Sequence, residues 1–120
     1  MPKQADIQSF LPLTPAVFHI LMSLYGSEMH GYAIMEEVKR TTEGRVKMGP
    51  GTLYGTIKRL LDAKLVEESD HRPDPERDDE RRRYYRLTNL GGKVMKAEIQ
   101  RYAKVLETAA AKGLPIPAIA

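Results

Sequence analysis

Apolar residues recur along most of this chain at the spacing of an amphipathic helix, and the pattern predicts four helices. The predicted helices cover residues 15–26, 30–44, 51–63 and 89–112. The first begins with Thr14 as N-cap and Pro15 at the first helical position, and the last ends before Gly113. Two β-rich segments, residues 65–70 and 82–87, predict the strands of a hairpin. Residues 45–48 alternate in polarity, and we expect a short strand there as well.

The predicted order is therefore helix, helix, short strand, helix, hairpin, helix. Three helices followed by a hairpin are typical of a winged helix-turn-helix, in which the last helix before the hairpin enters the major groove. The expected fold class is mainly α with a small β-hairpin, plus a C-terminal dimerisation helix. We expect an N-terminal arm with little structure of its own at 1–13, the winged helix-turn-helix domain at 14–87, the dimerisation helix at 88–113 and a tail at 114–120.

Two helices have more apolar surface than one domain core needs. The first carries a second apolar face beside the one formed by Ile20, Leu21 and Leu24, and the last has apolar residues spaced 4, 3, 4 and 3 apart, which is a heptad seam. Such faces predict a homodimer, which suits an operator made of two half-sites. The expected interface residues are Phe18, Met22, Met95, Ile99, Tyr102, Leu106 and Ala109.

The third helix has a polar face of the composition that a groove-reading helix needs: small residues, hydroxyls and cations. A solvated face is the alternative, but it leaves the mid-helix Gly55 unexplained, since glycine there costs about 0.5–1 kcal/mol relative to alanine. Tyr54 lies on the flank of this face, where it either reaches a phosphate or covers the core. The residues expected to bind DNA are Lys47, Gly51, Thr52, Tyr54, Gly55, Lys58, Arg59, Arg81, Arg82 and Arg83.

The arginines of the hairpin alternate across a strand, so only some of them can face DNA. Their alternative role is to protect an edge strand by charge. The five carboxylates in residues 74–80 do not fit a phosphate-binding surface. We expect this loop to be solvated and mobile, held away from DNA; no calcium-loop spacing supports a metal site there.

Composition narrows the function further. The net charge of +3 and pI near 9.2 are only mildly basic. The charge is unevenly distributed, however, since residues 45–64 contain five basic residues and only one acidic residue, Asp62. The chain has no cysteine, no phosphate-binding glycine loop and no paired histidines, so we expect no enzyme activity, no metal and no cofactor. With neither a signal peptide nor an apolar run that could span a bilayer, a cytoplasmic protein without membrane contact is expected.

Four short motifs resemble those of the PadR family of transcriptional regulators. They are His30-Gly31-Tyr32, Gly51-Thr52-Leu53-Tyr54, Lys58-Arg59-Leu60 and Arg82-Arg83-Tyr84-Tyr85-Arg86-Leu87-Thr88 with Gly91 or Gly92 after it. The resemblance spans residues 13–112. It implies a winged helix with a C-terminal dimerisation helix, action as a repressor, and relief of repression by a phenolic or other planar compound. It also places Thr52, Tyr54 and Lys58 on the DNA-reading helix.

The chain departs from the family pattern in two respects. Gly55 stands where many relatives carry proline, and there is no tryptophan, on which some short relatives stack flat aromatic drugs. The expected function is a sequence-specific, dimeric DNA-binding regulator, a repressor with a small-molecule effector still to be identified. The alternative is a winged-helix protein-interaction module without specific DNA binding; Lys58 and Arg59 argue against it, and the acidic loop leaves it open.

Overall fold

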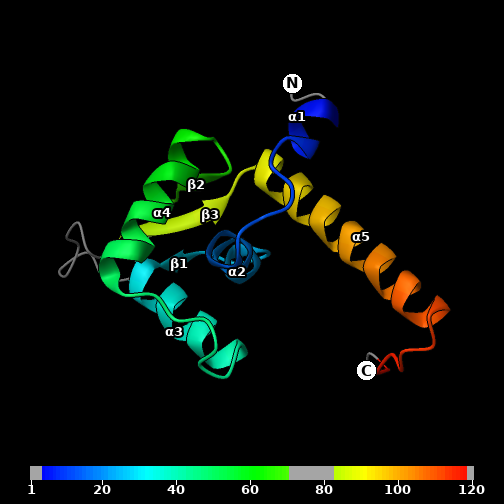
Figure 1. The fold of residues 1–120 in the computed structure, drawn as a ribbon. Coiled ribbons are helices and arrows are strands. Elements are labelled where there is room, and N and C mark those ends of the chain that lie inside the picture. Colours follow the sequence, from blue (N-terminus) through cyan, green and yellow to red (C-terminus); the bar gives the residue numbers. More distant parts are fainter. Residues whose placement is uncertain (1–3, 71–82, 119–120) are drawn as a thin grey trace.

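The computed structural model describes residues 4–70 and 83–118, with side chains from residue 6 onward, as five helices and three short strands (Figure 1). The helices are α1 (Gln4–Gln8), α2 (Pro15–Leu24), α3 (Gly31–Thr41), α4 (Pro50–Asp62) and α5 (Asn89–Ala111). The strands are β1 (Met29–His30), β2 (Val66–Glu68) and β3 (Tyr84–Leu87), paired antiparallel in the order β1-β3-β2. The expected fold class, mainly helical with a small sheet, is confirmed.

Helix α2 lies at the centre of the domain, with α3 and α4 on one side and α5 on the other (Figure 1). It begins as the sequence predicts: the Thr14 hydroxyl accepts the N–H of Val17 at 3.3 Å, and Pro15 occupies the first turn. The core forms where the apolar faces of α2, α3, α4 and the first half of α5 meet. Its fully buried members include Ile20, Leu21, Ile34, Val38, Leu53 and Val94.

The strand expected at residues 45–48 is wrong, because residues 45 and 46 form a bend after the turn at 42–44, and residues 47 and 48 have no regular secondary structure. The Thr42 side chain holds the turn: its hydroxyl oxygen accepts the N–H of Val46 at 3.0 Å and lies 3.1 Å from the carbonyl oxygen of Val46. The third strand is instead β1, in which Met29 pairs with Tyr85 and His30 with Tyr84. A two-residue strand is too short to show a periodicity in the sequence, and β1 is a strand only through its pairing with β3.

The N-terminal segment has more structure than the expected arm. Residues 4–8 form α1, which packs against α5 and buries Ile7. The backbone N–H of Leu13 donates to the carboxylate of Glu98 on α5 at 2.8 Å. The segment before α2 is therefore part of the packed structure.

Helix α5 is joined tightly to the winged domain at its beginning and then extends away from it (Figure 1). Thr88 caps it by accepting the N–H of Gly91 at 3.0 Å, and the same hydroxyl donates to the carbonyl of Lys64 at 2.6 Å. A Cβ on Gly91 would collide with the carbonyl oxygen of Leu65, so this position has to be glycine. The buried residues of α5 end at Glu98, and the rest of the helix projects from the domain.

Candidate nucleic-acid interface

Helix α4 packs onto the domain through its apolar face and presents its polar face to solvent. Gly49 is its N-cap and Pro50 lies in its first turn, where a missing N–H costs nothing. Leu53, Ile57 and Leu60 are buried against α2, α3 and the beginning of the wing. Thr56 is buried beside them, and because these residues recur at helical spacing, the positions on the opposite side of α4 point away from the core.

The outward face of α4 carries six of the ten residues that the sequence predicts to bind DNA. Gly51, Thr52, Tyr54, Lys58 and Arg59 are exposed and Gly55 is half-buried. Neither glycine has a packing reason: a Cβ built on Gly51 or Gly55 meets nothing within 4 Å, and neither has a positive φ. Each costs the helix up to about 1 kcal/mol relative to alanine, the full amount in the helix interior. The fold therefore does not explain why these two positions lack a side chain.

Tyr54 packs across the interface between α4 and α3. Its phenol oxygen lies 2.5 Å from the place where a Cβ on Gly31 would stand, so the ring occupies the space that this glycine leaves open. The residue is still 36% exposed. Of the two roles predicted for Tyr54, the structure thus shows the packing contact directly, and the exposed part of the side chain still borders the polar face.

The two cations of α4 differ in their surroundings. Arg59 donates from Nη2 to the hydroxyl of Thr56 at 3.2 Å, and Thr56 donates to the carbonyl of Thr52 at 2.7 Å. Among the ion pairs of the described residues, none involves Lys58, Arg59 or Lys47. Lys47 is exposed in the irregular segment just before α4. The cations around α4 therefore keep their charge available to an anionic ligand.

The wing arginines that the structure describes are bound to carboxylates. Arg83 Nη1 lies 3.2 Å from Glu68 of β2. Arg86 on β3 bridges two acids, with Nε 2.9 Å from Glu67 and Nη1 3.3 Å from Glu28, and these bonds raise the pKa of the guanidinium. Arg86 thus links the strand β2 to the segment before β1. Arg81, Arg82 and the acidic loop at 74–80 lie outside the described residues.

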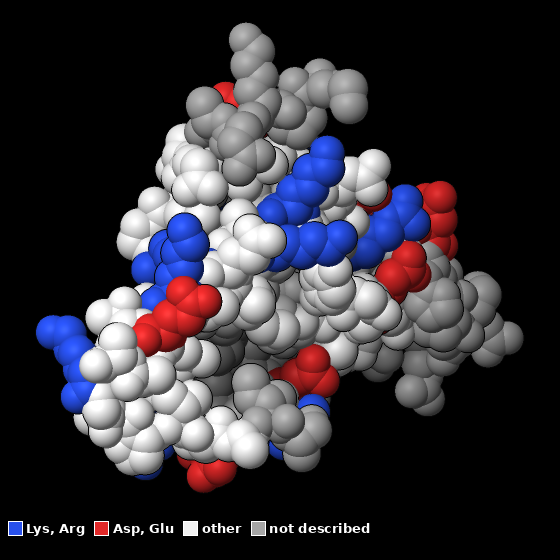
Figure 2. Space-filling model, turned by 90° about the vertical axis from the view of Figure 1, so that its right-hand side faces the viewer, with Lys and Arg blue, Asp and Glu red and all other residues white. Residues whose placement is uncertain are grey.

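A second surface carries most of the residues that the sequence assigns to a dimer interface. On α5, Ile99 is 44%, Tyr102 37% and Leu106 43% exposed, and Ala109 is half-buried; Met22 of α2 is 41% exposed. Phe18 stacks on Tyr102 with ring centroids 5.1 Å apart, which joins the two helices. Met95 differs, because at 2% exposure it belongs to the core of its own domain. Figure 2 faces the side of the molecule on which α5 lies, and much of that side is uncharged.

A groove of about 470 Å³ lies between α2 and α5 within this surface. Met22, Tyr25, Met95 and Ile99 provide its apolar lining, and Lys96 and Gln100 provide its polar groups. The groove therefore shares residues with the predicted dimer interface.

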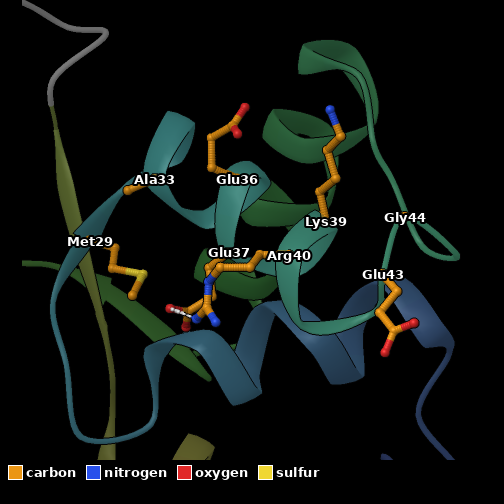
Figure 3. Close-up of a pocket in the computed structure, with 8 residues that line it drawn as sticks. All are labelled: Met29, Ala33, Glu36, Glu37, Lys39, Arg40, Glu43 and Gly44. Atoms are coloured by element: carbon orange, nitrogen blue, oxygen red, sulfur yellow. Dashed lines mark hydrogen bonds and ion pairs between the residues drawn. The ribbon is translucent and has the colours of Figure 1, made fainter.

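A larger groove of about 750 Å³ runs along the exposed side of α3 (Figure 3). Glu36, Glu37 and Glu43 line it together with Lys39 and Arg40, and Glu37 pairs with Arg40 at 3.4 Å. Charges of both signs are mixed along it, which selects no particular ligand. In the described parts of the chain no group of three His, Asp or Glu side chains could hold a metal ion, and no helix has the length and apolar character of a membrane span.

Sequence reasoning missed Glu98, a fully buried carboxylate on α5. Its neighbours Arg101 and Leu13 donate hydrogen bonds to it; those from Arg101 lower the pKa of the carboxyl most, although burial opposes them. A signal was present: on a helical wheel Glu98 falls on the same side as Val94, Met95 and Tyr102.

Comparison with known proteins gives consistent matches. A family model described as "Transcriptional regulator PadR-like family" matches residues 20–97, more than half of the chain. A curated protein of Lysinibacillus sphaericus, described as "Uncharacterized protein X", is 28% identical over 88 residues, which are 73% of this chain and 78% of that protein.

Solved structures extend the comparison to nearly the whole chain. A transcriptional regulator from Clostridium thermocellum is 20% identical, with a TM-score of 0.63 over 96% of this chain and 100% of that one. A PadR family transcription regulator from Clostridium difficile is 23% identical, with a TM-score of 0.65 over 82% of this chain and 97% of that one. At these identities the likeness establishes the fold.

Proposed function

Because this chain belongs to the PadR-like family of transcriptional regulators, we propose that it is a dimeric repressor that binds double-stranded operator DNA through α4. The operator is proposed to be two-fold symmetric, since a symmetric dimer presents two equivalent helices to two half-sites. The proposal assigns α4 to the major groove and the wing to the neighbouring backbone.

The observation that carries the proposal is the outward face of α4. Gly51 and Gly55 lie four residues apart on the same side of the helix, and open space surrounds both. A helix that lacks side chains at two positions, at a cost in stability that no contact among the described residues explains, is suited to a surface that must come very close. Base edges in the major groove are such a surface.

The neighbours of the two glycines supply the contacts that DNA binding needs. Thr52 offers a hydroxyl and a methyl group near the beginning of α4, where a recognition helix meets base edges. Lys58 lies nearly two helical turns further on and supplies a phosphate contact. In this arrangement Thr52 and the glycines lie towards the bases, and the lysine fixes the register of the helix.

Dimerisation through α5 and the outer face of α2 completes the proposal. Ile99, Tyr102 and Leu106 expose apolar surface along the projecting half of α5. A second copy of the chain would bury this surface and hold two α4 helices at a fixed separation. The effector that the family resemblance implies would act here, since the groove of about 470 Å³ has the size of a small-molecule site.

Titrating the protein with salt tests the proposal. Fluorescence anisotropy with labelled DNA from upstream of the protein's own gene gives Kd at several salt concentrations. We expect tight binding that weakens steeply with salt, and Lys58→Ala should lower the affinity and reduce the slope by about one unit for each lost phosphate contact. The matched control is Lys104→Ala, an exposed lysine on the side of α5 opposite the apolar seam, which should change neither value. Equal behaviour of the two variants would contradict the assignment of α4.

A protein-interaction module without specific DNA binding is the second candidate, and the wing favours it. Arg83 pairs with Glu68, and Arg86 pairs with Glu67 and Glu28, so part of their positive charge is already neutralised by carboxylates of the same chain. This candidate predicts no preference for upstream DNA over random DNA of the same length in the same titration.

A further inference from the structure

Glu98 is the last buried residue of α5 and therefore the last point at which the winged domain holds this helix. Gly91, Val94 and Met95 before it are also buried. From Ile99 to Ala111 every residue is exposed or half-buried. At 1.5 Å per residue this free part is about 20 Å long, so a turn of about 10° at Glu98 would move the end of α5 by about 3 Å.

The carboxylate of Glu98 is bound from two directions. On one side, its Oε2 accepts the backbone N–H of Leu13 at 2.8 Å, which ties α5 to the segment between α1 and α2. On the other side, Arg101 Nε lies 2.5 Å from Oε1 and its Nη2 lies 3.2 Å from Oε2. Hydrogen bonds are directional, whereas apolar contacts between helices are tolerant of sliding and rotation.

The same network reaches the apolar surface of the predicted dimer interface. The Arg101 guanidinium lies 5.2 Å from the ring centroid of Tyr102, and Tyr102 stacks on Phe18 of α2. A bond that fixes Glu98 therefore also fixes the two aromatic rings that a second copy would meet.

A buried carboxylate is not the most stable choice for this position. Replacing a buried ion pair by apolar residues of similar volume is often neutral or stabilising, so a buried charge is weak evidence for a purely stabilising role. Its neighbours Ala97 on α5 and Leu13, which contacts it through a backbone N–H, are partly buried apolar residues that pack against the core. An apolar residue would fit here, but it would not select one direction for α5.

We propose that Glu98 is a positioning residue that sets the direction of α5 relative to the winged domain. In the dimer it thereby sets the separation of the two α4 helices and the half-site spacing that the protein accepts. This second part rests on the proposed function, whereas the direction of α5 within one chain does not.

The distance between α4 and α5 can be measured directly. The chain has no cysteine, so Asp62→Cys at the end of α4 and Glu107→Cys on α5 create a specific pair of spin-label sites. Pulsed electron paramagnetic resonance on doubly labelled chains, diluted with unlabelled protein, reports the distance within one chain. We expect one narrow distribution in the wild type and a distribution at least twice as broad in Glu98→Met.

Two further variants separate positioning from general destabilisation. Glu98→Gln should give an intermediate width, because the amide oxygen can still accept from Leu13 but the salt bridge to Arg101 is lost. Lys104→Met, an exposed change on the side of α5 opposite the apolar seam, should leave the width unchanged. Thermal melts should place Glu98→Met close to the wild type, which a merely stabilising role would not allow.

Binding to duplexes with altered half-site spacing gives the functional readout. Wild type should prefer one spacing, whereas Glu98→Met should lose about tenfold in affinity at that spacing and bind single half-sites unchanged. Wild-type width and spacing preference in whichever Glu98 variants fold would overturn the proposal. If instead the wild type binds no operator while Glu98→Met broadens the distance distribution, the proposed function fails and the positioning of α5 by Glu98 stands.

Discussion

Gly55→Ala should change the stability of the fold and the DNA affinity of α4 in opposite directions. The added methyl group points into open space, since a Cβ at this position meets nothing within 4 Å and the backbone is not in the left-handed region. The substitution should therefore recover the helix propensity that glycine forfeits, about 0.5–1 kcal/mol. For a chain of this size that corresponds to a rise in Tm of roughly 2–5 °C.

DNA binding should change in the opposite direction. If α4 lies against base edges, the methyl group enters a packed interface, where an extra methyl group costs about 1–3 kcal/mol. Since each factor of ten in Kd corresponds to about 1.4 kcal/mol, and a dimer carries the substitution twice, we expect operator affinity to fall at least about tenfold. The expected result is a protein that is more stable and binds more weakly.

Gly92→Ala provides the matched control. Gly92 is also a helical glycine with open space around it, but it lies on α5, away from α4. It should raise Tm in the same way and leave Kd unchanged. Calorimetry at one protein concentration and anisotropy at one salt concentration measure both quantities. A Gly55→Ala protein that binds its operator as tightly as the wild type would refute the close approach of α4 to DNA.

Three other predictions follow from the contacts described above. Ile99→Asp places a charge in the exposed apolar seam of α5 and should give a monomer by light scattering with operator binding lost; a dimer would place the interface elsewhere. Glu68→Gln removes one negative charge beside Arg83 and should raise affinity for random DNA about two- to fivefold at low salt; unchanged affinity would mean that this part of the wing does not reach DNA. Because the pKa of Glu98 lies below its ordinary value of 4.5, the stability it contributes is present above that value and is lost as the pH falls below it. Acid melts should therefore show less loss of stability in Glu98→Gln than in the wild type.

The four longer helices could be predicted because their signals are local, whereas the short α1 was missed. Leu53, Ile57 and Leu60 recur at helical spacing, and this periodicity alone separates the buried face of α4 from its polar face. Thr14 and Thr88 are typical N-cap residues at the predicted beginnings of α2 and α5, and the structure shows that both cap these helices. The positions of the predicted groove-facing residues on α4 follow directly from that periodicity.

What could not be predicted depends on partners far away in the sequence. Met29 and His30 form a strand only because Tyr84 and Tyr85 lie beside them, 55 or so residues later, whereas the alternating residues 45–48 had no strand to pair with. One of the hydrogen bonds to the buried Glu98 comes from the backbone N–H of Leu13, 85 positions earlier in the sequence. The pairing of Arg83 with Glu68 likewise depends on the register of β2 and β3, which single-sequence patterns do not fix.

The contact between Tyr54 and Gly31 constrains how this protein can evolve. A methyl group at position 31 would require the phenol ring at position 54 to move, and with it a residue on the border of the face proposed to read DNA. In homologues the two positions should therefore covary, with alanine at 31 accompanied by a smaller residue at 54. The residue at position 31, in the first turn of α3, thus limits which side chains position 54 can accept by a single substitution. A change of operator preference that requires another residue at position 54 would therefore depend on an earlier change at position 31.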